Sequence, residues 1–346
     1  MACTLVLWPF NKNLYRKINS YLAYSWWCHF TFLGQWWSGS ECELYIDPSD
    51  LPYISNEHAL VIMNHKYDID WLMGWIIIER FGMLGGSKIY GKRNLMYIPI
   101  LGWIWYLTES IFLKRHWSED QKTLIHDVQQ LTEFPERYWV TILLFCEGTR
   151  FTEEKHKISM EVADQKGLPR LRHHLLPRTK GFVLSLQAMK GKIPVIYDCT
   201  VGFRKDAAEP TLMNILNGRT CRAEMHVRRI PVEEIPYEDE EACSVWLHNL
   251  YQYKDKIFHE FTIKGRFEGL QKHKVPRRYW DLSIWIGWAV VLCTPLILYT
   301  MKIIREGSHL SNLLLLVAAF ALTYVATRWS MGLSDIKKGS SYGKMK

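Results

Sequence analysis

Residues 59–70 read ALVIMNHKYDID, an apolar run followed at once by a polar cluster. The uninterrupted apolar residues from Ala59 to Met63 predict a buried β-strand. Ligands of α/β sheets usually bind at the carboxyl ends of strands, so we expect His65 and Asp70 to lie at such an edge. This stretch therefore predicts both the class of the core and the position of a functional site.

The residue types in this cluster suit general base catalysis. With an ordinary pKa of about 6.5, His65 can accept a proton near neutral pH, and the carboxylate of Asp70 can fix its tautomer and stabilise the imidazolium. A hydroxyl held against the imidazole would become a nucleophile without a covalent enzyme intermediate. The spacing does not fit one face of a helix, so a turn must separate the two residues. The alternative is a structural histidine.

A second polar turn follows another apolar run, where residues 144–150 read LFCEGTR. Gly148 allows close approach of the backbone to a ligand, and Arg150 offers a planar fork that suits a phosphate. Taken alone, the same letters also fit a turn from strand to loop whose arginine pairs with a surface acid.

Short β-rich runs alternate with helical patterns between residues 41 and 275, which predicts an α/β domain over that range. We expect strands at residues 42–46, 60–63, 141–145, 193–197 and 225–229. We expect helices at residues 70–81, 94–108, 117–134, 178–189 and 240–261.

The C-terminal part of the chain carries the membrane signals. Residues 282–303 are apolar except for Lys302, and a run of roughly 20 residues is long enough to cross a bilayer. Residues 310–326 form a second apolar run after a short linker, so residues 276–330 predict a transmembrane hairpin followed by a cytosolic tail, 331–346. Basic residues flank the hairpin and place the bulk of the protein in the cytosol: Lys272, Lys274, Arg277, Arg278, Arg328, Lys337 and Lys338. The alternative is a buried helical hairpin.

The N-terminal residues 1–40 predict a membrane-associated segment. Its aromatic-rich part, Tyr21–Trp37, is interrupted by polar residues, which favours an interfacial or embedded helix over a complete span. The formal charge of +8 and sixteen tryptophans also suit a lipid surface or phosphorylated ligands. Nucleic acid is not an expected partner, because the basic residues are dispersed and no binding motif is present. The eight cysteines form no CxxC pair or zinc-ligand pattern.

Two further blocks join the NHxxxxD and EGTR motifs. Residues 91–103, GKRNLMYIPILGW, are followed by IFLKR at 111–115, and IPV lies at 193–195. The four ordered blocks resemble the glycerol-phosphate and lysophosphatidate acyltransferase family. Residues 174–182, HLLPRTKGF, and 336–343, IKKGSSYG, look like the gamma and delta 1-acylglycerol-3-phosphate acyltransferases. The resemblance covers nearly the whole chain and implies the glycerolipid acyltransferase fold, a mixed sheet flanked by helices.

The resemblance also implies roles for individual residues. His65 would be the catalytic base and Asp70 its orienting partner. The acceptor-phosphate site would consist of Glu147, Gly148, Thr149 and Arg150. Three basic residues would bind the same anion or the phosphates of coenzyme A: Lys92, Arg93 and Arg115. Pro194 would shape the wall on the acyl side. No metal or organic cofactor is implied, and acyl-coenzyme A (acyl-CoA) serves as co-substrate.

The implied reaction transfers an acyl group from acyl-CoA to the sn-2 hydroxyl of 1-acyl-sn-glycerol 3-phosphate (lysophosphatidic acid), giving phosphatidic acid and CoA. Membrane lipids would be further partners. The expected location is the endoplasmic reticulum membrane, with the Golgi or another endomembrane as alternatives and the active site in the cytosol. A lysophospholipid acyltransferase for another head group and a catalytically weak lipid-binding protein remain alternatives. A metal-dependent phosphohydrolase is disfavoured, because the sequence has no second cluster with ligand spacing.

Overall fold

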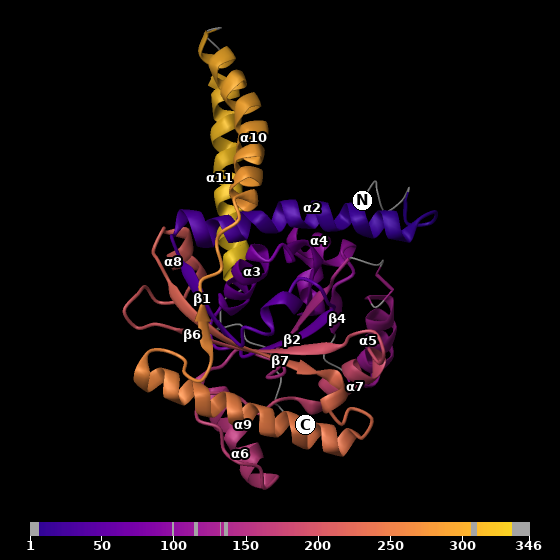
Figure 1. The fold of residues 1–346 in the computed structure, drawn as a ribbon. Helices are drawn as coiled ribbons and strands as arrows, with labels where there is room; N and C mark the ends of the chain where they lie inside the picture. The colour runs from indigo at the N-terminus through magenta and orange to yellow at the C-terminus, as the bar shows by residue number, and fades with distance from the viewer. Residues whose placement is uncertain are drawn as a thin grey trace. The chain divides into compact units, whose positions relative to one another are not determined.

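The computed structural model describes residues 7–98, 100–113, 117–131, 133–134, 138–305 and 310–333. The chain divides into two compact units, Met1–Arg278 and Tyr279–Lys346. The first unit holds a β-sheet with helices on its faces, and the second holds two long helices (Figure 1).

The described strands of the first unit form one eight-stranded sheet in the order β4-β3-β5-β2-β6-β7-β1-β8. Neighbours from β4 to β6 run parallel, β6 and β7 are antiparallel, β7 and β1 are parallel, and β8 is antiparallel to β1. The strands are β1 (Glu41–Ile46), β2 (Ala59–Met63), β3 (Ser87–Lys92), β4 (Ile111–Leu113), β5 (Thr141–Leu144), β6 (Val195–Phe203), β7 (Arg222–Pro231) and β8 (Gln271–His273). The predicted α/β fold with a mixed sheet flanked by helices is confirmed.

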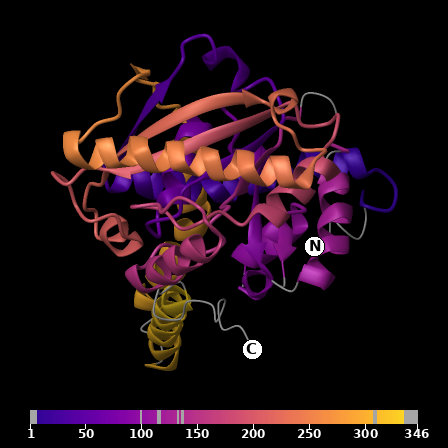
Figure 2. The ribbon, with the colours of Figure 1, turned by 90° about the horizontal axis from the view of Figure 1, so that it is seen from below.

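Side chains of β2 alternate between two hydrophobic cores. Leu60 and Ile62 belong to the core that includes α5 (Trp117–Leu131), α7 (Thr179–Ala188) and α9 (Glu240–Lys264). Ala59 and Met63 belong to the core that includes α3 (Asp70–Arg80). Helices thus cover both faces of the sheet, and α9 crosses one face along its length (Figure 2). Burial on both faces explains why this strand is an uninterrupted apolar run.

The predicted strands and most predicted helices are confirmed as β1, β2, β5, β6, β7, α3, α5, α7 and α9, with shifted ends. The single helix expected at residues 94–108 is wrong. This segment is a 3-10 helix, η4 (Arg93–Tyr97), followed by α4 (Leu101–Leu107). Between them Ile98 is extended and Ile100 has a φ of 66°. Ile98 precedes a proline, and the residue before a proline is disfavoured in helical conformation.

Several elements had no sequence prediction: β3, β4, β8, α6 (Glu153–Gln165), α8 (Leu212–Leu216), η2 (Leu51–Tyr53), η3 (Leu84–Gly86) and η5 (Val232–Glu234). Among them, α6 is largely polar and buries only Met160 and Ala163. Its sequence therefore gave little hydrophobic periodicity.

The aromatic N-terminal segment is part of one long helix, α2 (Lys12–Phe32), which continues as the π-helix η1 (Leu33–Trp37). One side of α2, which includes Trp27 and Cys28, is buried against the rest of the first unit. Tyr21 and Leu22 on the same helix remain exposed at 63% and 55%. The helix therefore has a face that packs on the α/β core and a face that carries exposed apolar groups.

The second unit contains α10 (Trp280–Arg305) and α11 (Leu310–Leu333). Within α10, Trp280–Ile303 is long and apolar enough to cross a membrane, with a mean hydropathy of 1.9. Val317–Ala326 in α11 is a shorter apolar stretch. Among the described residues, α10 is thus the one helix that meets the requirement for a span. Most of the predicted tail, from residue 334 onward, lies outside the described residues.

Candidate active site

His65 lies two residues after β2, at the edge of the sheet where the parallel strands β2 and β5 end. Its Nδ1 is 3.3 Å from Oδ2 of Asp70, and its side chain is 19% exposed. The imidazole stacks on Phe145 with ring centroids 4.0 Å apart. The carboxylate accepts the Nδ1 proton, so Nε2 is the nitrogen left to act as a base.

Asp70 is fully buried and organises the loop that carries His65. Its Oδ2 also accepts the backbone N–H groups of Lys66 at 2.7 Å and Tyr67 at 2.8 Å. These bonds close the turn that brings Asp70 back to the imidazole. Burial raises the pKa of Asp70, and the hydrogen bond from His65 partly offsets this rise.

Glu147 connects the EGTR turn to the histidine loop. Its Oε1 accepts the backbone N–H of His65 at 3.0 Å, and its Oε2 accepts the backbone N–H of Leu175 at 3.1 Å. The residue is 2% exposed. Burial raises its pKa to about 8, against the lowering effect of the two backbone hydrogen bonds. Its carboxyl group therefore contacts protein backbone on both sides and holds His65 in place.

The rest of the EGTR turn lies beside this bridge. Gly148 has a φ of +71°, a conformation that favours glycine. Oγ1 of Thr149 accepts a hydrogen bond from Nζ of Lys155 at 2.8 Å, and the carbonyl of Arg150 accepts another at 3.1 Å. The residue after the turn, Phe151, donates its N–H to the carbonyl of His65 at 2.8 Å. The structure thus brings the two predicted motifs together through backbone and side-chain contacts.

Lys92 and Arg93 lie at the same edge of the sheet. The register places Ile89 level with Leu143 of β5, which is level with Val61 of β2. Three residues onward, Lys92 ends β3 at the level of Asn64, two strands away, or roughly 10 Å across the sheet, and Arg93 begins η4 directly after it. Arg115 lies outside the described residues.

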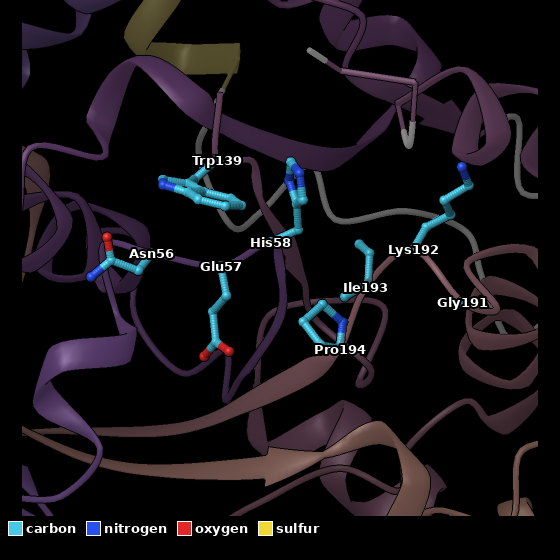
Figure 3. Close-up of a pocket in the computed structure, with 8 residues that line it drawn as sticks. All are labelled: Asn56, Glu57, His58, Trp139, Gly191, Lys192, Ile193 and Pro194. Carbon is cyan, nitrogen blue, oxygen red and sulfur yellow. The ribbon is translucent and has the colours of Figure 1, made fainter. Parts of the chain in front are cut away.

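Pro194 lies at the opposite edge. It precedes β6, whose first residue pairs with Ala59, the first residue of β2. Pro194 is thus level with His58, and His65 comes seven positions later, so the separation along the strands is roughly 20 Å. There Pro194 lines an open pocket of about 430 Å³, which Figure 3 shows with Asn56, Glu57, His58, Trp139, Gly191, Lys192 and Ile193. The structure does not bring Pro194 to His65, and its acyl-wall role stays a prediction.

Three polar residues at the histidine loop and the EGTR turn were not predicted from the sequence. Both amide atoms of Asn64 bond to the backbone of Val201, which ties the end of β2 to β6. Lys155 and Arg178 contact the EGTR turn from α6 and from the start of α7. Asn64 could have been found as the polar residue that ends the strand, and Arg178 as the basic residue in the HLLPRTKGF stretch. Among the described residues, no group of three or more His, Cys, Asp or Glu side chains is arranged to hold a metal ion.

Comparisons with known proteins identify the class of this fold and site. Residues 46–201 match the family model described as Acyltransferase, and residues 214–288 match the one described as Acyltransferase C-terminus. The first match covers the strands and turns that position His65, Asp70 and Glu147. The protein is therefore an acyltransferase.

Three relatives narrow the family. The chain is 46% identical over 343 residues to 1-acyl-sn-glycerol-3-phosphate acyltransferase delta of Bos taurus, which covers 99% of this chain and 89% of the relative. It is 47% identical to the delta protein of Homo sapiens over 340 residues, 98% of this chain and 88% of the relative. It is 45% identical to the gamma protein of Homo sapiens over 341 residues, 99% of this chain and 89% of the relative. The chain belongs to the 1-acyl-sn-glycerol-3-phosphate acyltransferase family, as the sequence motifs predicted.

Proposed function

We propose that this enzyme transfers an acyl group from acyl-CoA to the sn-2 hydroxyl of 1-acyl-sn-glycerol 3-phosphate, giving phosphatidic acid and CoA. The observation that carries the proposal is the contact between His65 Nδ1 and Asp70 Oδ2. It leaves Nε2 as the base, in a chain whose relatives are named for acyl transfer to this acceptor.

The proposed reaction needs one base and an activated acyl donor. As the acceptor oxygen attacks the thioester carbonyl, His65 Nε2 takes the hydroxyl proton and the charge of Asp70 stabilises the imidazolium. The C–S bond then breaks, and the departing sulfur takes the proton from His65. An ester and free CoA result, and His65 returns to its neutral state without an added cofactor.

The EGTR turn is the proposed binding place of the acceptor phosphate. Arg150 would supply the fork, Thr149 a hydroxyl and Gly148 close backbone access. Glu147 supports this site through its bonds to the backbones of His65 and Leu175. Lys92 and Arg93, at the same sheet edge, would bind this phosphate or those of CoA, and Arg115 would extend that basic segment.

We place the enzyme in the endoplasmic reticulum membrane, with its active site on the cytosolic side. The apolar stretch Trp280–Ile303 supports one span, and α11 would supply the returning span of a hairpin. Exposed Tyr21 and Leu22 on α2 would lie at the lipid interface. A membrane anchor would keep the enzyme at the bilayer that holds its lipid acceptor.

The test measures thiol release from acyl-CoA by purified protein in detergent or lipid. We expect release only when lysophosphatidic acid is present, and we expect His65→Ala to abolish it while the thermal midpoint stays unchanged. His126→Ala is the matched control, because that side chain is 76% exposed on α5. Metal-dependent release of phosphate in place of thiol would contradict the proposal.

A panel of acceptors separates the second candidate, a transferase for another lysophospholipid head group. Arg150→Ala should raise the KM for lysophosphatidic acid more than it lowers kcat, because the guanidinium binds the phosphate. A wild-type preference for a choline or ethanolamine head group would favour the second candidate. If no thiol is released from acyl-CoA with either class of acceptor, the result would favour a lipid-binding protein.

A further inference from the structure

Two cations outside the four ordered blocks contact the EGTR turn. Lys155 lies in the first turn of α6, and Arg178 immediately precedes α7. They contact Thr149 and Gly148, adjacent residues of the turn that also carries Arg150. The fold therefore gathers three positive side chains at one short loop.

The position of the Lys155 ammonium is fixed by two oxygens. Nζ lies 2.8 Å from Oγ1 of Thr149 and 3.1 Å from the carbonyl oxygen of Arg150. The side chain comes from a helix capped by Thr152, whose Oγ1 accepts the N–H of Lys155 itself at 3.3 Å. Both ends of Lys155 are thus anchored at the turn, so its charge is preorganised there.

Arg178 lies against the glycine of the turn. A Cβ atom on Gly148 would be 2.7 Å from Nε of Arg178 and 2.8 Å from its Cδ. The backbone N–H of Arg178 donates to the carbonyl of Cys146 at 2.7 Å, which fixes the start of the side chain. Arg178 as a whole residue is exposed. Glycine at position 148 is what permits this approach.

The acid of the EGTR turn is Glu147. The carboxyl oxygens of Glu147 are both directed to backbone N–H groups, and the residue is buried. A phosphate has three oxygens that accept charge-assisted hydrogen bonds, so several cations converging on one loop suit it. The chemistry favours a phosphate monoester over an uncharged head group.

Two kinds of phosphate could bind here, one in the acceptor and one in CoA. The turn is bonded to the histidine loop on both sides, through Glu147 to the N–H of His65 and through Phe151 to its carbonyl. In the acceptor, only one carbon and one oxygen separate the phosphate from the reacting sn-2 carbon. In CoA, the long pantetheine arm separates the phosphates from the thioester. A site this close to His65 fits the acceptor.

We propose that Lys155 and Arg178 bind the phosphate of the acceptor lipid together with Arg150 and so determine acceptor specificity. This inference rests on the proposed function and assigns two further binding residues to the same site.

The test compares Lys155→Met and Arg178→Met with wild type. Each variant should raise the KM for lysophosphatidic acid roughly tenfold, because each removes one charge-assisted hydrogen bond. The KM for acyl-CoA should stay within about threefold of the wild-type value, because a charge removed at a distance from CoA is largely screened by salt. Lys157→Met on the same helix and Arg170→Met on the surface are charge-matched controls, and both should resemble wild type.

Conservative variants and a second acceptor separate binding from folding. Lys155→Arg and Arg178→Lys should recover part of the affinity for lysophosphatidic acid. Any slow acylation of monoacylglycerol, which lacks phosphate, should be equal in wild type and in the Met variants. The thermal midpoint identifies a variant that has lost its fold. In that case the KM values of the conservative variants are compared with wild type instead.

An unchanged KM for lysophosphatidic acid in both Met variants, with wild type active, would overturn the inference and leave the proposed function standing. An equal rise in the KM for acyl-CoA would assign the two cations to CoA and also overturn it. If wild type releases no thiol with lysophosphatidic acid, the proposed function itself fails.

Discussion

Replacing Asp70 with asparagine tests how much the buried charge contributes to catalysis. Asparagine can keep a carbonyl oxygen at the position of Oδ2, which accepts the N–H groups of Lys66 and Tyr67. The other oxygen, Oδ1, has no hydrogen-bond partner among the described residues, so an amide nitrogen there breaks no described bond. We expect the stability to change by no more than about 1 kcal/mol, because the variant also removes a buried charge.

The catalytic effect follows from the distance between the charges. At 3.3 Å, an imidazolium and a carboxylate attract by about 5 kcal/mol with an effective dielectric constant of about 20. If about half of the proton charge is on His65 in the transition state, the loss is about 2.5 kcal/mol, or about 70-fold in kcat. Asp70→Asn should therefore be folded and slow.

The assay is steady-state thiol release with lysophosphatidic acid and acyl-CoA, accompanied by the thermal midpoint. Asp68→Asn is the control, because its Oδ2 accepts the N–H of Leu212 at 3.1 Å and the residue lies in the same loop. We expect this control to keep kcat within about threefold, since the described contact of the Asp68 carboxylate is with the backbone of Leu212, whereas Asp70 contacts the imidazole of His65 directly. A folded Asp70→Asn variant with the kcat of wild type would refute the reasoning.

Two further predictions concern buried charges. Burial raises the pKa of Glu147 from 4.5 to about 8, so its protonated form contributes stability below pH 4.5 that is lost as the pH rises through 8. Glu147→Gln has no such carboxyl group, so its thermal midpoint should fall less than that of wild type between about pH 5 and pH 8. An equal fall of the thermal midpoint with pH in the two proteins would contradict this. Burial alone would raise the pKa of Asp198, but Lys254 and Arg228 lower it below 3.8. The ionised carboxylate of Asp198 therefore stabilises the wild-type fold above pH 3.8, and this stabilisation is lost as the pH falls further. Lys254→Met should lower the free energy of unfolding by about 3 kcal/mol at neutral pH, measured by denaturant unfolding. An unchanged free energy of unfolding would show that Arg228 alone compensates the charge of Asp198.

The strand before His65 could be predicted because its environment is simple. Residues 59–63 are covered by helices on both faces, so every position is apolar and the run ends where the sheet ends. Strand β3 lacked this signal. It includes Lys88, which is buried against Phe134 with Nζ 5.0 Å from the ring centroid. A lysine in a short strand gives no apolar pattern, so tertiary contacts overrode the local sequence.

The pairing of His65 with Asp70 could be inferred only from the chemical properties of the two residue types, and its geometry could not be predicted. Their spacing fits no regular element, and the turn exists because Asp70 accepts two backbone N–H groups from the residues between them. Such side-chain-to-backbone bonds leave no periodic pattern. The hydrogen bond from the N–H of Leu175 to Glu147 was still harder to predict, because it joins residues 28 positions apart in the sequence.

The position of Pro194 follows from a constraint that the motif order does not express. His65 and Glu147 follow strands β2 and β5, whereas Pro194 precedes β6, and these strands are parallel. Residues that follow and residues that precede parallel strands must lie at opposite edges of a sheet. Four ordered motifs can therefore identify a family while one of them lies about 20 Å from the others. The residues of β6 that reach the edge of His65 are at its other end, where Val201 bonds to Asn64. The EGTR turn, which follows its strand, can contact an acceptor held at His65, whereas Pro194 can contact only a part of a substrate that extends the length of the sheet.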